Sequence, residues 1–256
     1  MEYENQFLFQ ETYMSRFTEI NKVLKFLISL DSIRAYDDDG LCNQFYAELF
    51  VNSSTVGEEH TQEDIRQVIS NTSKANVYLM IYNLIEFTVS NLLQAIYDRV
   101  EGESCSYLEV NKDLKEIWHH CKIRSAINDF SANGKTMERI SWNIVDDVIK
   151  RNIIQLDPRK TMQGGNLDGE TIKHTMEKHG IHITNLREVY RPDKLKEIRE
   201  KRNGLAHGLI SFSEAGSQVT VSDLEDLANS VKKFLDQLMQ DVALYIRDRK
   251  HMEQLG

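Results

Sequence analysis

The stretch of residues 74–100 constrains the fold more than any other part of the chain. If this stretch forms a helix, its inward-facing positions cover well over half of the helix circumference. These positions are Val77, Met80, Ile81, Leu84, Ile85, Thr88, Leu92, Ala95 and Ile96. A surface helix carries a single apolar stripe, so a helix with this pattern is expected at the centre of a bundle. Glu86 lies within the same register, and a buried carboxylate needs a hydrogen-bond donor or must stay protonated.

Helical periodicity recurs along most of the chain. One amphipathic stripe predicts a helix over residues 7–30, formed by Tyr13, Phe17, Ile20, Leu24 and Leu27. Start and stop signals predict further helices from near Thr61 (with Asp64 as a cap), over 106–127, over 168–178 and over 192–206. A capping box of Ser222 and Glu225 is expected to begin the last helix, whose stripe is Leu224, Leu227, Val231, Leu235, Leu238, Val242 and Ile246.

Three segments interrupt this pattern. Residues 37–40 predict a turn, followed by a short apolar segment at 41–51 that fits helix or strand, and by a loop at 52–57. Residues 128–168 are the least periodic part of the chain and predict an insert. Residues 213–216 predict a turn flanked by two short strands, 209–212 and 218–221.

The composition favours an all-α fold. With two prolines and twelve glycines in 256 residues, the chain is poor in the turn formers that a β-sandwich of this size needs. No internal repeat and no linker rich in proline or serine divides it. We therefore expect one helical bundle over residues 1–256, with an acidic helical extension at 1–60 and a core at 61–256 that contains the insert and the short hairpin.

The net charge of −9 is unevenly distributed. Residues 1–70 hold 13 acidic and 5 basic side chains, whereas the rest of the chain is close to neutral. A protein that coats nucleic acid through its phosphates would be strongly basic, so any nucleic-acid chemistry must come from a local site. The acidic leading segment is expected to be a solvated face, with docking on a basic partner as the alternative.

Localisation signals are also informative. The chain has no run of about 18 apolar residues, and its first residues are acidic rather than basic, which predicts neither a membrane span nor a secretory signal. Cys42, Cys105 and Cys121 are an odd number of cysteines without C-x-x-C spacing. They predict reduced thiols in a cytoplasmic protein.

Most chemistry-bearing motifs are absent. The sequence has no phosphate-binding glycine motif and no G-x-S-x-G, so a nucleotide triphosphatase, a dinucleotide oxidoreductase and an α/β hydrolase are unsupported. Two histidine groups, one at 119–121 and one formed by His174, His179 and His182, have spacings that do not converge on one ion from a helix. They are expected to be surface or internally bonded histidines, with no metal and no cofactor.

The remaining candidate is the segment 201–208, Lys-Arg-Asn-Gly-Leu-Ala-His-Gly. Arg202 and His207 are five positions apart, so a helix with a loosened last turn can direct both at one pocket. Gly204 and Gly208 would let backbone or substrate come close. The alternative is a helix end at which both cations complement the helix dipole. Residues 187–202 carry seven basic and four acidic side chains, a local excess of positive charge.

The segment "KEIREKRNGLAHG" resembles the signature of the HEPN family (higher eukaryotes and prokaryotes nucleotide-binding domain). That signature is an arginine, commonly followed by a polar residue, and a histidine four to six residues later. Three further segments are similar to parts of HEPN proteins: "YLMIYNLIEFTVSNLL", "GNLDGETIKHTMEKHGI" and "VTVSDLEDLANSVKKFLDQL". Together they cover about residues 74–100 and 166–246.

The resemblance implies an all-α HEPN fold, a homodimer with two facing motifs and a metal-independent endoribonuclease. It also implies a role as a toxin or in anti-phage defence, with an antitoxin or restriction-modification partner. Arg202 and His207 match the two catalytic motif positions, Asn203 matches the polar position, and Glu86 matches a helix glutamate that supports them. The alternatives are a non-catalytic HEPN module that binds nucleotide, RNA or a partner protein, and a plain helical interaction protein.

The residue types suit RNA cleavage. RNA supplies its own nucleophile in the 2′-OH, so the reaction needs neither a metal nor a cofactor. Histidine titrates near neutrality and can move a proton, while the guanidinium of arginine can stabilise charge on the phosphorus. Because the motif supplies one histidine per chain, each chain offers a single proton carrier at the site. Pairing two motifs across a dimer axis would complete the site.

Overall fold

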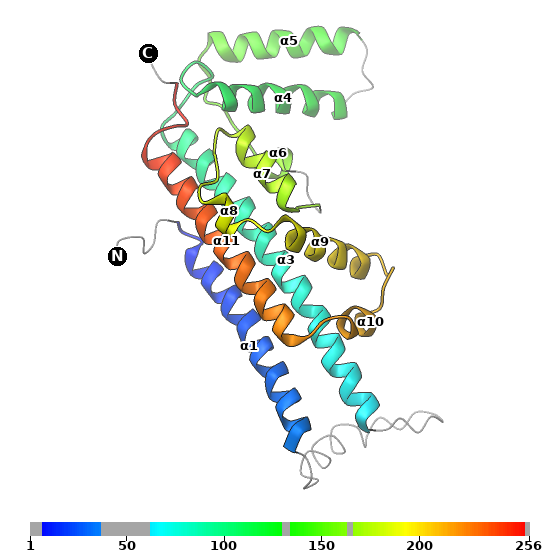
Figure 1. Ribbon diagram of the computed structural model, residues 1–256. Coiled ribbons are helices and arrows are strands. Elements are labelled where there is room, and N and C mark those ends of the chain that lie inside the picture. Colours follow the sequence, from blue (N-terminus) through cyan, green and yellow to red (C-terminus); the bar gives the residue numbers. More distant parts are fainter. Residues whose placement is uncertain (1–6, 37–61, 130–133, 163–165, 254–256) are drawn as a thin grey trace. The chain divides into compact units, whose positions relative to one another are not determined.

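The computed structural model describes residues 7–36, 62–129, 134–162 and 166–253 (Figure 1). The helices of this part are α1 (Gln10–Tyr36), α3 (Gln62–Gly102), α4 (Lys112–Asp129), α5 (Gly134–Ile149), α6 (Pro158–Thr161), α7 (Gly169–Lys178), α8 (Leu186–Val189), α9 (Pro192–Ala206), α10 (Phe212–Ser217) and α11 (Val221–Arg247). These residues contain no strand, only two isolated bridges. The all-α prediction is confirmed.

The chain divides into two compact units. Unit 1 comprises residues 1–11, 85–193 and 233–256, and unit 2 comprises residues 12–84 and 194–232. Helices α3 and α11 each contribute one part of their length to unit 1 and the other part to unit 2. The expectation of one bundle over residues 1–256, with an extension at 1–60 and a core at 61–256, stays a prediction. The helix predicted within the extension is α1, and its apolar stripe is buried.

Helix α3 is continuous from Gln62 to Gly102, so the helix start predicted near Thr61 and the apolar stretch 74–100 belong to one helix. It is apolar on most sides, as predicted, with fully buried residues in both units: Val77, Ile81, Tyr82, Ile85, Val89, Leu92, Leu93 and Ile96. Among the described helices it is the one long and apolar enough to cross a membrane by length and composition, but half of its most apolar window is buried inside the protein. The core helix of a water-soluble protein shows the same combination.

The stripes predicted for the first and last helices are confirmed. All five apolar residues of the α1 stripe are buried, and so are Leu224 to Val242 of the α11 stripe, whereas Ile246 is half-buried. In unit 2, α1 contacts α11 where Lys232 lies over the Phe17 ring. The capping box lies two residues earlier than predicted. Thr220 and Asp223 exchange backbone-to-side-chain hydrogen bonds of 3.1 Å, so they cap α11 in place of Ser222 and Glu225.

The hairpin predicted around residues 209–221 is wrong. Residues 212–217 form the short helix α10, which begins where the Ser211 hydroxyl accepts a hydrogen bond from the Glu214 backbone N–H at 3.1 Å. A serine followed three residues later by glutamate starts a helix as readily as a turn. Burial selects the helix here, because Ala215 and Gly216 are buried in unit 2.

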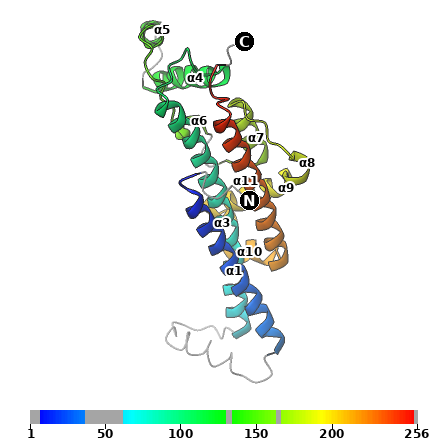
Figure 2. The same ribbon diagram turned by 90° about the vertical axis from the view of Figure 1, so that its left-hand side faces the viewer.

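The predicted insert at 128–168 contains helices in its described part. Helices α5 and α6 occupy much of it, and α5 runs beside α4 (Figures 1 and 2). Helix α4 begins at Lys112, six residues later than predicted, because Ser106 donates two hydrogen bonds to Glu109 and forms a separate turn. The turn, apolar segment and loop expected at 37–57 lie outside the described residues, as does Cys42.

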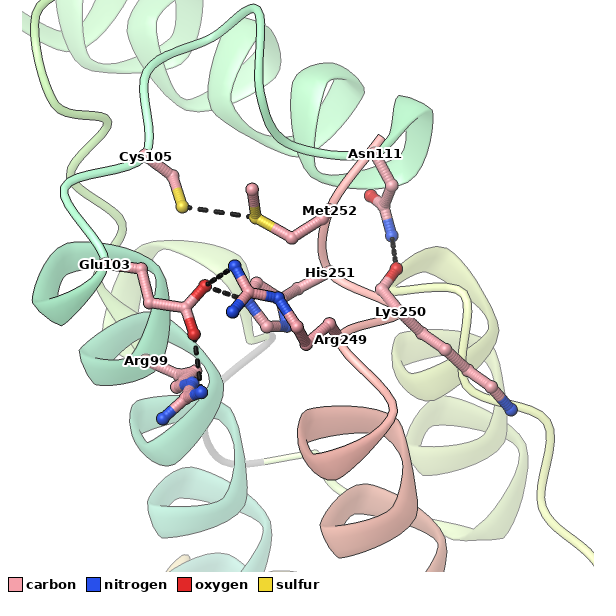
Figure 3. A network of polar contacts seen from close by, with 8 residues as sticks. All are labelled: Arg99, Glu103, Cys105, Asn111, Arg249, Lys250, His251 and Met252. Atoms are coloured by element: carbon pink, nitrogen blue, oxygen red, sulfur yellow. Dashed lines mark hydrogen bonds and ion pairs between the residues drawn. The ribbon is translucent and has the colours of Figure 1, made fainter. Parts of the chain in front are cut away.

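A polar network attaches the C-terminal segment to the connection between α3 and α4 (Figure 3). The Glu103 carboxylate pairs with Arg99 at 2.5 Å, Arg249 at 3.0 Å and the buried His251 at 3.1 Å. Burial raises the pKa of Glu103, but the His251 hydrogen bond and the two arginine charges outweigh it, so the pKa lies below its usual range. The Asn111 backbone N–H donates to the His251 carbonyl at 2.8 Å, which aligns the two segments.

Helices α7 and α9 begin where the sequence predicts. The Asp168 side chain caps α7 by accepting a hydrogen bond from the Thr171 N–H at 2.8 Å, and the chain turns at Gly180 with a positive φ. Pro192 opens α9, which ends at Ala206. Both helix boundaries therefore follow from local capping chemistry.

Gly216 offers a test of the packing that selects α10. A Cβ at this position would overlap the Asn71 carbonyl group of α3, and the carbonyl carbon would lie 2.5 Å away. We expect Gly216→Ala to lower the free energy of unfolding by about 1–3 kcal/mol, because backbone cannot move aside cheaply. Urea denaturation followed by circular dichroism measures the effect.

The matched control is Gly102→Ala, because nothing lies within 4 Å of a Cβ at this helical position. It should be neutral or stabilise by up to about 1 kcal/mol. Equal stabilities of the two variants would contradict the close packing of α10 on α3.

Candidate functional site

Helix α9 presents the 201–208 segment from unit 2. Its buried residues Leu195, Ile198 and Leu205 follow helical spacing and hold one face of the helix in the core. Apart from the buried Gly204, the positions between them are exposed or half-buried, and Arg202 and Asn203 are half-buried at the edge of the packed face. The amphipathic pattern of α9 therefore determines how far Arg202 is exposed.

Arg202 is held by an aromatic ring from α3. Its guanidinium carbon lies 4.6 Å from the centroid of the Tyr82 ring, which is fully buried. Its Nη1 also donates a hydrogen bond of 2.9 Å to Oδ1 of Asn203. A cation over a ring is attracted by the negative face of the π system, and the attraction grows as water is removed. Arg202 is thus in contact with its neighbour Asn203 and with Tyr82 of α3.

The end of α9 determines the position of His207. Gly208 follows the helix with φ of +67°, its N–H donates to the Leu205 carbonyl at 3.3 Å, and the Leu209 N–H donates to the Gly204 carbonyl at 2.8 Å. This pair of hydrogen bonds with a left-handed glycine is the Schellman ending of a helix. His207 is the last residue before the reversal, and its side chain is exposed.

Gly204 serves packing. A Cβ there would lie 3.0 Å from two side-chain carbons of Ile210, so the absent side chain leaves room for Ile210 to fold back onto α9. Ile210 and Leu79 pack against a buried cluster of Ala75, Leu205 and Ala215. This contact anchors the segment that follows His207. The sequence predicts that Gly204 and Gly208 let substrate or backbone come close. In the structure Gly204 makes room for the Ile210 side chain, and Gly208 adopts the left-handed conformation that ends the helix.

Two apolar side chains next to His207 face solvent. Leu209 is 77% exposed and Phe212 is 37% exposed. Both belong to unit 2, and they follow the helix end directly in the sequence. In the sequence the motif is thus followed by two exposed apolar side chains, Leu209 and Phe212, which are called the apolar patch.

A second contact between α3 and α9 lies one turn away on α3. The Tyr78 hydroxyl donates to Oε1 of Glu197 at 2.6 Å, and burial together with this carboxylate raises the pKa of Tyr78. Sequence reasoning missed both tyrosines, because it assigned the α3 face to core packing alone. Their spacing of four places them on one face, which is the signal that could have identified them.

Glu86 is half-buried on α3. It belongs to unit 1, whereas Arg202, Asn203 and His207 belong to unit 2. The supporting role that the resemblance implies for Glu86 therefore stays a prediction. Half-burial agrees with the expectation that this carboxylate interrupts an apolar helix.

The histidine groups behave as surface or internally bonded residues. His119, His120, His174 and His182 are exposed, whereas His179 is buried and hydrogen-bonded on both ring nitrogens. Within the described ranges no group of three or more histidine, cysteine or acidic side chains has the geometry to hold a metal ion. Cys105 is buried, Cys121 is half-buried, and both are free thiols.

A comparison with protein-family models matches residues 9–251 to the family described as HEPN_MAE_28990-like HEPN. The match covers nearly the whole chain, including α1 and the segment 128–168, for which the sequence offered no counterpart. Comparisons with curated proteins and with solved structures found no match.

Proposed function

Because the chain belongs to the HEPN family, we propose that this HEPN module is a metal-independent endoribonuclease whose catalytic residues are Arg202 and His207. The observation that carries the proposal is a motif arginine fixed over a buried ring, five positions before an exposed histidine at the helix end. An ordered cation and an accessible proton carrier are the two groups that cleavage through the 2′-OH requires.

In the proposed reaction the ribose 2′-oxygen attacks the adjacent phosphorus and the 5′-oxygen leaves. The products are a 2′,3′-cyclic phosphate and a 5′-hydroxyl, and DNA is inert because it lacks the nucleophile. His207 transfers a proton at one of the two oxygens. Arg202 stabilises the negative charge that builds on the phosphoryl oxygens, for which its planar fork of donors is suited.

Asn203 and Glu86 are proposed as supporting residues. Asn203 accepts a hydrogen bond from Arg202 Nη1, which helps to fix the guanidinium for contact with phosphate. For Glu86 the proposal is a positioning role without proton transfer, since the carboxylate interrupts an apolar helix. In the cell we propose a cytoplasmic toxin or anti-phage role, restrained by an antitoxin or restriction-modification partner. The alternative is a non-catalytic HEPN module that binds nucleotide, RNA or a protein.

The first test uses purified protein and total RNA in EDTA. We expect His207→Ala to lower the cleavage rate by about 10²–10⁴-fold, the usual contribution of a general acid or base. Arg202→Ala should lower it by about 10²–10³-fold, the usual loss when a donor to a developing oxyanion is removed. The control is Lys196→Ala, which removes an exposed cation of α9 that pairs with Glu200 and should keep full activity.

Full activity of a folded His207→Ala protein would contradict the assignment. Binding of RNA without cleavage by the wild-type protein would favour the non-catalytic alternative. Circular dichroism verifies that each variant retains its helical content.

The second test concerns the role of Tyr82. We expect Tyr82→Leu to lower the cleavage rate by about 3–30-fold, because a cation over a desolvated aromatic ring gains about 0.5–2 kcal/mol. Tyr82→Phe retains the ring and should keep most of the activity. If both variants are folded and lose activity equally, the hydroxyl rather than the ring face positions Arg202, and the proposed role is wrong.

The third test concerns the dimer, in which two motifs face each other. The apolar patch of Leu209 and Phe212 next to His207 supports an interface there, because burying it removes apolar surface from water. We expect Leu209→Asp to convert a dimer into monomers and to lower cleavage. Leu8→Asp changes a still more exposed leucine outside the patch and is the control. Light scattering gives the mass of each species.

Mixing chains tests whether the site is shared. If each site uses Arg202 from one chain and His207 from the other, inactive Arg202→Ala and His207→Ala chains should restore part of the activity when mixed. A monomeric mass at micromolar concentration with undiminished cleavage would refute the shared site.

A further inference from the structure

Helices α4, α6 and α7 of unit 1 line a cavity of about 570 Å³. This volume lies within the range of small-molecule sites, about 300–1,000 Å³. The cavity lies entirely within unit 1, whereas the Arg202 motif lies in unit 2. The proposed ribonuclease chemistry therefore makes no use of it.

One side of the cavity rests on an internally bonded group around His179. His179 Nδ1 lies 2.6 Å from the Thr175 carbonyl oxygen, which only accepts hydrogen bonds, so Nδ1 carries the proton. Nε2 then accepts from the Tyr97 hydroxyl at 2.7 Å, and that hydroxyl lies 2.9 Å from the Thr161 hydroxyl. Burial lowers the pKa of His179 to about 4, so the imidazole is neutral at pH 7. This side of the cavity is rigid and uncharged.

The walls carry an excess of positive charge. Four basic side chains, Arg124, Lys160, Lys173 and Lys178, and two acidic ones, Glu170 and Glu177, line the cavity, a net formal charge of +2 in a chain of net charge −9.

Both carboxylates already have partners. Glu170 accepts from the Tyr190 hydroxyl at 2.8 Å, and Glu177 pairs with Lys173 at 3.9 Å. In the parts of the chain that the structure describes, Arg124, Lys160 and Lys178 make no ion pair.

We propose that this cavity binds a small molecule that carries at least two phosphate charges. Arg124 and Lys160 come from α4 and α6 and Lys178 from α7, so one bound group would contact three helices. Such a ligand supplies the acceptor oxygens that these cations lack, and charge-assisted hydrogen bonds of this kind are the stronger ones in proteins. The exposed His120 and His174 add two further ring donors when protonated.

A small molecule fits better than a strand of RNA. A protein that binds single-stranded nucleic acid needs a basic groove that follows the backbone, with aromatic side chains on which successive bases stack. Here the cations surround one cavity, and the described residues that line it include no phenylalanine, tyrosine or tryptophan. The shape therefore favours one compact, multiply charged ligand.

The test is isothermal titration calorimetry with inorganic triphosphate as the probe, at constant ionic strength set with sodium chloride. We expect wild-type protein to bind with one site per chain, and Arg124→Gln/Lys160→Gln to bind at least about tenfold more weakly, because two charge-assisted hydrogen bonds are lost. The matched control is Lys112→Gln/Lys150→Gln. It removes two positive charges from exposed lysines of unit 1 that are outside the cavity and pair with Glu116 and Asp146.

Equal loss of affinity in the control would show attraction by net charge alone and would overturn the proposal, as would the absence of binding at millimolar triphosphate. A single-stranded oligonucleotide that binds more tightly than triphosphate, and that the same cavity variant abolishes, would assign the cavity to RNA and also overturn it. The His207→Ala protein should bind triphosphate like wild type, so failure of the proposed catalytic role leaves this test unchanged.

Discussion

The burial of the apolar residues of α3 is the constraint on which the rest of the structure depends. A helix that is apolar around most of its circumference must pack against other helices, and α3 has fully buried residues in both units. Tyr82 is fully buried for this reason. Its immobile ring then offers a fixed face to the Arg202 guanidinium at 4.6 Å. A cation over a ring is attracted by the negative face of the ring, so this contact helps to orient Arg202.

Local chemistry explains why part of this arrangement was predictable. Pro192, Asp168 and the spacing of Leu195, Ile198 and Leu205 specify helices through interactions between near neighbours in the sequence, and the structure agrees with each. The position of Arg202 and His207 at the end of α9 follows from the same signals. The contact with Tyr82 joins residues 120 positions apart, so no periodicity in either segment reveals it.

The predictions that the structure contradicts also failed because contacts between distant residues cannot be seen in local sequence. The hairpin predicted after residue 208 rested on a turn-like segment, and burial of Gly216 against Asn71 converted that segment into α10. The capping box of α11 lies two residues earlier than predicted. Thr220 with Asp223 and Ser222 with Glu225 are equivalent patterns in sequence, and only packing distinguishes them. Gly204 looked like an access point for substrate, yet the side chain that approaches it is Ile210. In each case a tertiary contact decided between local alternatives.

Two regions of this acidic protein are rich in basic residues, the stretch 187–202 and the cavity of unit 1. They differ in which of their charged groups have partners. The stretch 187–202 has the larger excess of basic residues in sequence, but on α9 Lys196 and Arg199 both pair with Glu200, and Lys201 donates to Gln218. Arg202 of the same helix lies over the Tyr82 ring. In the unit 1 cavity, among the residues that the structure describes, Glu170 and Glu177 have partners, whereas Arg124, Lys160 and Lys178 make no ion pair. A local excess of lysine and arginine thus has different consequences at the two places, because neighbouring carboxylates and hydroxyls decide which charges remain for a ligand.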